Sequence, residues 1–371
     1  MKIKSPLSCP ILALACSALA SLTAAAEPSF PELETLIAKA DANLKIPGGS
    51  VRVVEDREIV FDRYFGTFSE DSKTPWDEQT VVAIASISKS VTATLVAVLV
   101  GEGNLSFDDP ISKYLPEYAA LTLQNSDQSV RSPTIAECLS HTSGFPGGTM
   151  GKLPKNSPVK RGDQAEVARH LATQGLAARP GTQYAYTFRG FAAVSRVIEV
   201  VTGRPIAEVM LEKLLSPLGM NETTFTLGVS LVRRLPLFAS RAEGRSDDEV
   251  ATQIERYRAE RGPFINTAGA LISTPGDLQR FLQFHADKGR VGNQQIAPAS
   301  VLAKLYQRQP ASKNYGLGFS IRGSKVIGHG GATGTSVNVD LKTGHILIVF
   351  TQAGGPNARP LTSGATKVAF P

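Results

Sequence analysis

The 371-residue sequence predicts an α/β fold with one antiparallel sheet built from both chain ends, flanked by helices, and an inserted mainly helical domain. Two observations support this prediction. β-rich runs lie near the two ends, at 50–66 and 314–352, whereas the segments from about 104 to 270 are helical or loop-like. We therefore expect a sheet domain formed by 27–103 together with 271–371, and a helical domain formed by 104–270.

Residues 1–26 resemble a secretory signal peptide. Lys2 and Lys4 precede the apolar run ILALACSALASLTAAA, and small residues up to Ala26 offer a cleavage site. Two alternatives stay open: a lipidated Cys16, because ALAC loosely matches a bacterial lipobox, and an uncleaved anchor. We expect export to the periplasm or the extracellular space, with membrane attachment only if Cys16 is lipidated.

The remaining elements follow from local patterns. Apolar residues at helical spacing predict a helix over 30–44, and two β-rich runs about Asp56-Arg57 predict a hairpin. Three further strands are expected within 314–323, 334–341 and 345–352, with KVIGHGG (325–331) between the first two. A helix near 277–289 should cover the sheet. The tail 353–371 lacks the apolar periodicity of a packing helix.

Composition narrows the class of partner. The hydrophobic fraction of 42% and the charged fraction of 19% are those of an ordinary globular protein. Without residues 1–26 the chain has 37 basic and 33 acidic residues, a net +4, and no basic stripe interleaved with aromatics, so nucleic acid is not an expected partner. Cys138 then has no cysteine to pair with and is expected to be a buried, inert thiol.

The first candidate site is the stretch AIASISKS (83–90), which precedes a long apolar run. Ser86 and Lys89 stand at i and i+3, so a helix would present both side chains on one face. A serine hydroxyl needs a neighbouring base, and burial at a helix start lowers the pKa of a lysine toward that role. The same helix start offers the Ser86 N–H to an oxyanion. Ser157–Lys160 repeats the spacing, but Pro158 and a following glycine indicate a loop.

Five ordered blocks carry a family resemblance. They are TVVAIASISKSVTATLVAVLVGEGNLSFDDPISKYLPEY (80–118), TIAECLSHTSGFP (134–146), PGTQYAYTFRGFAAVSRVIEVVTG (180–203), NTAGALISTPGDLQRF (266–281) and YGLGFSIRGSKVIGHGGATG (315–334). Together they resemble the serine β-lactamase, penicillin-binding protein and esterase superfamily, in the branch of class C β-lactamases, DD-peptidases and related esterases. The resemblance covers most of the chain beyond residue 26 and implies a β-lactamase/transpeptidase-like fold.

The resemblance assigns further site residues. It implies that Tyr186 shares the base role with Lys89 and that Tyr184 is a buried aromatic residue. The family usually reads Y-x-N, yet this chain has Phe188 in place of the asparagine. An amide that could bind a substrate amide is thus replaced by an apolar ring, which favours esters over β-lactams and peptides if Phe188 lines the pocket.

The family's third motif is K-T-G or H-x-G on a strand beside the site. The literal K-T-G at 342–344 falls where a hairpin turn is expected, so His329-Gly330-Gly331 is the better match. The glycines let backbone approach a ligand closely. The alignment implies that Ala332 supplies the second oxyanion N–H and that His329 binds substrate, moves a proton or shapes the strand.

The other histidines give weaker indications of a functional role than His329 does. His141 lies in the LSHTSG block, where we expect structural hydrogen bonding. His170, His285 and His345 have no metal-ligand spacing, so no metal and no cofactor are predicted. A G-x-S-x-G motif is also absent from the sequence.

The sequence thus predicts an exported serine hydrolase that forms an acyl-enzyme on a small ester, amide or peptide substrate, with esters preferred. A β-lactamase or D-amino-acid peptidase is the alternative. The second alternative is a peptidoglycan- or peptide-binding relative that acylates slowly or not at all, or a protein that merely keeps the fold.

Overall fold

The computed structural model describes residues 30–42, 46–69, 71–154, 157–236 and 246–371. The predicted signal peptide and Cys16 lie outside these described residues. None of the helices in the described part of the chain combines the length and apolar character needed to cross a membrane.

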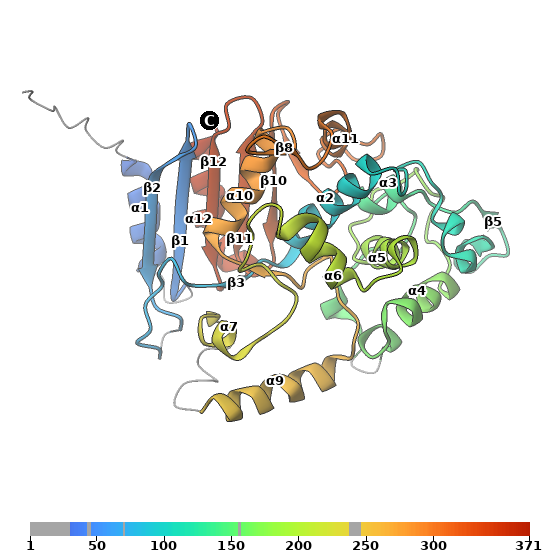
Figure 1. Cartoon of the computed structure of the whole chain (residues 1–371), viewed down its shortest axis with the longest axis horizontal. Helices are drawn as coiled ribbons and strands as arrows, with labels where there is room; N and C mark the ends of the chain where they lie inside the picture. Colours follow the sequence, from blue (N-terminus) through green and yellow to red (C-terminus); the bar gives the residue numbers. More distant parts are fainter. Residues whose placement is uncertain (1–29, 43–45, 70, 155–156, 237–245) are drawn as a thin grey trace, which may run out of the picture.

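A six-stranded sheet joins the two chain ends, in the order β2-β1-β12-β11-β10-β9. β1 (Gly48–Glu55) and β2 (Glu58–Gly66) come from the amino-terminal part, and β9 (Ser320–Arg322), β10 (Val326–Gly331), β11 (Thr335–Asp340) and β12 (Ile346–Thr351) come from the carboxy-terminal part. β1 pairs antiparallel with β12, so blue strands lie beside red ones in Figure 1. The predicted fold class is therefore confirmed, whereas the domain boundaries stay predictions.

The predicted hairpin turn lies between β1 and β2. Asp56 and Arg57 both have left-handed backbone, with φ of 48° and 71°. Two successive residues with positive φ are typical of the tight turns whose twist matches that of the flanking strands.

Helices cover both faces of the sheet. α1 (Pro31–Asp41) and α12 (Gly355–Ala369) pack on one face, where Leu33, Ile37 and Leu361 meet the strand residues Val51 and Leu347. α10 (Pro275–Ala286) contacts β11 and β12 and belongs, through Leu278 and Phe281, to the larger core on the other side.

The tail 353–371 forms a packing helix despite its weak apolar periodicity, because α12 occupies most of it. Its buried residues Ala358, Leu361 and Ala365 form a narrow stripe of mostly small side chains. Packing against α1 and the sheet can stabilise such a helix even where the apolar pattern is weak.

The glycine-rich segment 326–331 forms a full strand, β10, where the family's third motif implies a strand although the local pattern shows none. Gly328 explains why the strand pairs so closely with β11: a Cβ at this position would lie 2.0 Å from the Val337 carbonyl oxygen. Glycine therefore hides a strand that a period-two pattern would otherwise reveal.

The helical part lies on the opposite side of the molecule from α1 (Figure 1). Its centre is α2 (Ser88–Gly101), buried on nearly all sides. The other described elements are β3 (Val82–Ala83), η1 (Ala85–Ile87), η2 (Ile111–Lys113), η3 (Pro116–Tyr118), β4 (Leu121–Thr122), β5 (Ser129–Val130), α3 (Ile135–Leu139), η4 (Met150–Lys152), η5 (Pro158–Lys160), α4 (Gln164–Thr173), α5 (Arg189–Thr202), α6 (Ile206–Met210), η6 (Leu211–Leu215), α7 (Val229–Arg233), α9 (Asp247–Arg261), β6 (Ile272–Ser273), β7 (Arg290–Val291), β8 (Gln294–Gln295) and α11 (Ala299–Leu305).

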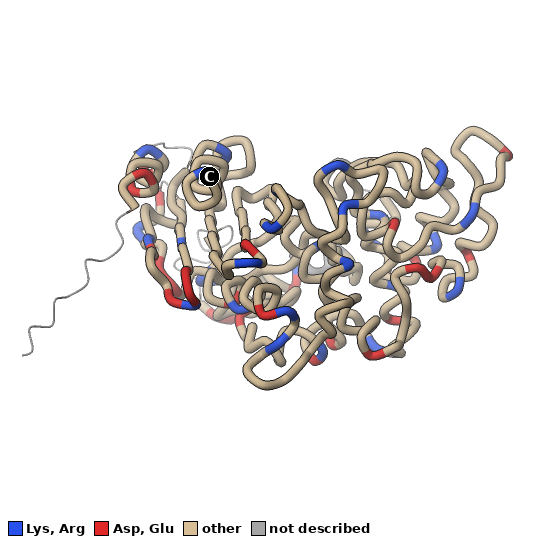
Figure 2. Tube along the Cα trace, turned by 90° about the horizontal axis from the view of Figure 1, so that it is seen from above, with Lys and Arg blue, Asp and Glu red and all other residues tan. Residues whose placement is uncertain are grey.

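Charged residues of both signs are distributed along the chain. Figure 2 shows basic and acidic residues interspersed along the trace. Cys138 is buried in α3, and burial raises the pKa of its thiol well above the ordinary value, as expected for an inert cysteine.

Candidate active site

Ser86 lies in η1, the single turn that leads into α2. The residue before it, Ala85, has a φ of 45°, a left-handed conformation that is uncommon outside glycine. Such backbone strain clusters at functional sites, where surrounding packing maintains it. The N–H groups at the start of a helical turn have no acceptor within the turn, so the Ser86 amide is suited to bind an oxyanion.

Lys89 sits one turn further on, at the start of α2, with only 3% of its surface exposed. Its Nζ lies 3.3 Å from Ser86 Oγ and donates a 2.8 Å hydrogen bond to the Ala268 carbonyl oxygen. The same nitrogen stands 4.7 Å from the ring centroid of Tyr186 and 5.7 Å from that of Phe191. Among the described residues no carboxylate pairs with it, and burial lowers the pKa of Lys89 to about 7. A substantial neutral fraction at neutral pH makes it a competent base.

Tyr186 reaches the same centre from the segment that precedes α5. Burial raises the pKa of its phenol, and a hydrogen bond with Ser86 opposes that rise only in part. A phenol with a raised pKa stays protonated at neutral pH. Tyr186 can therefore pass a proton to a leaving group, while Lys89 is the better base.

The end of β10 approaches Ser86 from the sheet. Thr333 Oγ1 donates a 2.6 Å hydrogen bond to the Ala83 carbonyl oxygen, and Thr335 Oγ1 donates one of 3.3 Å to that of Ile84. A Cβ on Gly331 would lie 2.6 Å from the Ile84 oxygen, so only glycine fits this close approach. The adjoining Gly330 and Ala332 are exposed, so the backbone beside Ser86 is accessible to a ligand here.

His329 does not fit the direct role that was expected. Its Nδ1 lies 2.7 Å from the Gly330 carbonyl oxygen and its Nε2 lies 2.9 Å from the Tyr315 hydroxyl. Since a carbonyl oxygen only accepts, Nδ1 carries the proton and Nε2 accepts from Tyr315. Both nitrogens are thus occupied, and burial, with the charge of Lys89, lowers the pKa of His329 to about 3. His329 thus joins its own strand to Tyr315.

Two aromatic expectations are also corrected. Phe188 is 3% exposed and belongs to the main core, with the Arg189 guanidinium 5.1 Å from its ring centroid, so it forms no wall of the pocket. Tyr184, expected to be buried, is 41% exposed and packs edge-on against His141 and Tyr315. The ring that faces solvent near the site is therefore Tyr184.

The rejected motif copies lie away from this centre. Lys160 donates to the Leu153 carbonyl oxygen within the 145–163 loop. Lys342 is exposed in the turn between β11 and β12.

The other histidines, all of them among the described residues, form no metal site. His285 is buried between Thr94 and Tyr306, and His345 contacts Glu55. Nowhere in the described part of the chain do three His, Cys, Asp or Glu side chains gather so that they could hold a metal ion.

Three features of the candidate site were not predicted from the sequence. Tyr315 and the Ala268 carbonyl come from segments distant in sequence from Ser86, and no spacing rule links them to it. The third is a polar pocket of about 380 Å³ between β9–β11 and α12. It borders Gly330 and Gly331, and its lining includes Arg322, Ser336, Asn338, Arg359, Thr362 and Ser363. No acidic residue lines it.

Comparison with known proteins agrees with this geometry. The chain is 28% identical over 243 residues to the D-alanyl-D-alanine-carboxypeptidase/endopeptidase AmpH of Escherichia coli, covering 64% of this chain but only 56% of that protein. It is 28% identical over 202 residues to esterase EstB of Burkholderia gladioli, covering 52% of this chain and 50% of the esterase. The chain thus spans little more than half the length of these relatives.

Among solved structures, EstCE1, described as a hydrolase with promiscuous acyltransferase activity, superposes with a TM-score of 0.72 at 17% identity. The match covers 90% of this chain and 97% of that one and supports the fold. A family model described as Beta-lactamase matches residues 33–366, which is most of the sequence. This chain therefore belongs to the β-lactamase family, whose members include serine hydrolases named as esterases and peptidases.

Proposed function

We propose that this protein is a serine hydrolase that forms an acyl-enzyme on Ser86 and prefers esters. The observation that carries the proposal is Lys89: a buried amine with a pKa of about 7 whose Nζ lies 3.3 Å from Ser86 Oγ. A buried lysine that serves only stability is expected to have a charged partner, because burying an unpaired charge is costly. Lys89 instead has a hydroxyl, a carbonyl and two aromatic rings around it.

The proposed chemistry uses these groups in turn. Neutral Lys89 takes the proton of Ser86 as Oγ attacks the substrate carbonyl, and the amides of Ser86 and Ala332 bind the oxyanion. The intermediate then collapses, and the leaving oxygen receives the proton from Lys89 through the Tyr186 hydroxyl. Water attacks the acyl-enzyme by the same route and gives its proton to Lys89, and the departing Ser86 oxygen recovers a proton from that group.

With Phe188 in the core, one structural observation favours esters. The exposed ring of Tyr184 offers an apolar surface near the site for an acyl chain or an aryl group. The relative named as an esterase supports the same choice.

A carboxypeptidase is the second candidate, and the polar pocket favours it. Arg322 and Arg359 line this acid-free pocket beside Gly330 and Gly331, and neither has an ion-pair partner among the described residues. Guanidinium groups bind carboxylates well. A substrate whose leaving group ends in a carboxylate could place it there, in line with the relative named as a D-alanyl-D-alanine-carboxypeptidase.

A substrate panel tests both candidates. Short p-nitrophenyl esters, a cephalosporin and a D-alanyl-D-alanine peptide are assayed with the parent protein, with Ser86→Ala and with Arg322→Gln/Arg359→Gln. We expect ester turnover that Ser86→Ala abolishes and the arginine double variant leaves unchanged. Peptide turnover that the double variant selectively weakens would favour the carboxypeptidase. Efficient cephalosporin hydrolysis would contradict the ester preference, and no acylation of Ser86 by any probe would favour a binding relative.

We also infer export, from Lys2, Lys4 and the apolar run that follows them. Mass spectrometry of the mature amino terminus should find cleavage after Ala26 or close to it. A diacylated Cys16 or an intact Met1 on exported protein would contradict this.

A further inference from the structure

His141 lies in the turn that follows α3, and this turn contacts the segment that carries Tyr186. We propose that His141 is a positioning residue that holds the backbone on both sides of Tyr186 and so aims the phenol at Ser86. This inference rests on the proposed function, in which Tyr186 carries a proton.

Two hydrogen bonds connect His141 to the residues that flank Tyr186. The Ala185 amide donates to the His141 carbonyl oxygen at 2.8 Å, and the Thr187 amide donates to the His141 ring at Nδ1, at 3.2 Å. The His141 ring also packs on the Tyr186 ring, with centroids 4.3 Å apart and planes tilted by 46°. His141 therefore contacts the main chain before Tyr186, the main chain after it and the Tyr186 ring itself.

Only the neutral ring can accept at Nδ1, because imidazolium has no free lone pair. Burial, followed by the nearby charges of Lys89 and His329, lowers the pKa of His141 well below the ordinary value. The proton of neutral His141 must then be on Nε2. That nitrogen is buried and has no hydrogen-bond partner among the described residues.

His141 also carries a backbone cost, since its φ of 62° is left-handed. A buried N–H without a partner and a strained φ both reduce stability, and they coincide at one residue that is 1% exposed. A purely structural position with this backbone conformation would be better served by glycine. The Nδ1 contact to Thr187 is what this histidine provides.

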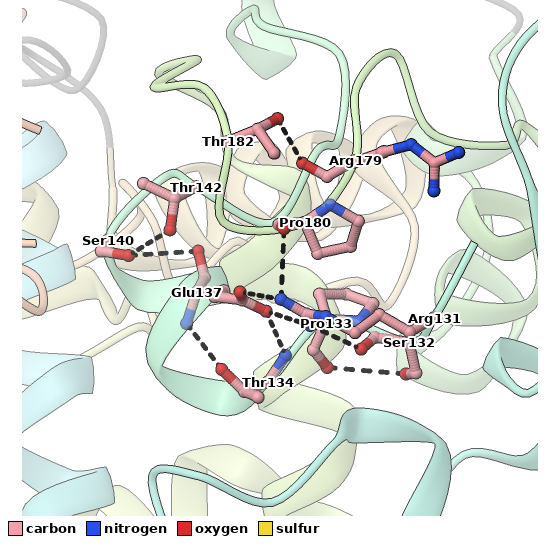
Figure 3. A network of polar contacts seen from close by, with 10 residues as sticks. All are labelled: Arg131, Ser132, Pro133, Thr134, Glu137, Ser140, Thr142, Arg179, Pro180 and Thr182. Atoms are coloured by element: carbon pink, nitrogen blue, oxygen red, sulfur yellow. Dashed lines mark hydrogen bonds and ion pairs between the residues drawn. The ribbon is translucent and has the colours of Figure 1, made fainter. Parts of the chain in front are cut away.

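The surroundings of the turn are fixed independently of His141. Figure 3 shows Arg131 and Glu137 joining α3 to the Pro180 turn, and the Arg131 guanidinium donates to the Pro180 carbonyl oxygen at 3.1 Å. The Gly181 amide donates to the Thr142 carbonyl oxygen at 2.7 Å. These contacts hold the start of the 180–188 segment. The Gly148 amide donates to the Tyr186 carbonyl oxygen at 2.9 Å, whereas the amides of the two residues that flank Tyr186 donate to His141.

A matched pair of variants separates positioning from general stability. In His141→Asn the side-chain oxygen can reach the Nδ1 position, and asparagine tolerates left-handed backbone. In His141→Gln the amide extends toward the Nε2 position and misses Thr187. We expect His141→Asn to keep kcat for a p-nitrophenyl ester within about threefold, and His141→Gln to lower it about 10²-fold with little change in KM, because misplaced groups can cost that much. Equal losses of kcat in two folded variants would overturn the proposal.

A double-mutant cycle asks whether the effect passes through Tyr186. In a Tyr186→Phe background, His141→Gln should lower the remaining kcat no further, although it lowers the melting temperature as it does in the parent. Losses of kcat that multiply would overturn the proposal. A Tyr186→Phe variant with full activity would instead contradict the proposed role of Tyr186.

Nitrogen NMR of the unmodified protein needs no variant to be active. At pH 7 the His141 ring, assigned by its absence in His141→Asn, should carry its proton on Nε2, and the Thr187 amide should be protected from exchange. A proton on Nδ1 would overturn the proposed contact even if every activity prediction held.

Discussion

Replacing Lys89 with methionine should remove activity and stabilise the protein, and the gain in stability should depend on pH. Methionine keeps most of the apolar stem of lysine without the charge. Turnover should fall about 10²–10⁴-fold, which is the usual consequence of losing a general base. The stability of the parent, in contrast, should be lowered by the cost of keeping this amine buried.

The magnitude follows from the pKa of Lys89, which is about 7 in the folded protein against 10.5 for an ordinary lysine. Between these values the unfolded chain binds a proton that the folded chain does not, so stability rises with pH across the window from 7 to 10.5. Each pH unit inside that window is worth about 1.4 kcal/mol. From pH 9 down to pH 6 the parent should lose about 3 kcal/mol through Lys89 alone, most of it above pH 7.

Denaturant unfolding of parent and Lys89→Met at pH 6 and pH 9 measures this. The variant also loses the hydrogen bond to the Ala268 carbonyl, but that loss is the same at both pH values and cancels in the comparison. The stability difference between variant and parent should be about 3 kcal/mol more favourable to the variant at pH 6 than at pH 9. Lys342→Met, at an exposed position, is the matched control and should show no such dependence. A difference independent of pH would mean that Lys89 titrates normally and is a poor base.

Three further predictions concern the site. For ester hydrolysis, kcat/KM should fall as the pH drops below about 7, because Lys89 becomes protonated; a pH-rate profile that is flat from pH 8 to 5 would exclude it as the base. Phe188→Asn should reduce the free energy of unfolding by about 3 kcal/mol without changing the ratio of ester to amide turnover, since the ring is core; a shift in that ratio would place it at the substrate. Gly331→Ala should lower kcat about 10²-fold, because the new Cβ would lie 2.6 Å from the Ile84 oxygen beside the oxyanion site; unchanged kinetics would separate β10 from catalysis.

Local sequence patterns were sufficient to predict part of the structure of this protein. The hairpin follows from two β-rich runs about Asp56-Arg57, and the pairing of Ser86 with Lys89 follows from their i and i+3 spacing on one turn. Both relations join residues close in the chain, where backbone geometry alone decides which side chains meet. The order of the motif blocks in turn identified the family before any contact was known.

The sequence by itself therefore determined the fold class and which serine and lysine are paired. Only the tertiary structure decided the electrostatics and directions at the site. Lys89 has a pKa of about 7 because packing around α2 excludes water, and its carbonyl partner Ala268 lies 179 residues away. Phe188 points into the core, Tyr184 faces solvent and His329 has both nitrogens occupied, and none of this follows from spacing. α12 likewise depends on docking, because its weak apolar stripe becomes stable as a helix only against α1 and the sheet. Burial and long-range hydrogen bonds are properties of the packed chain, which local periodicity does not encode.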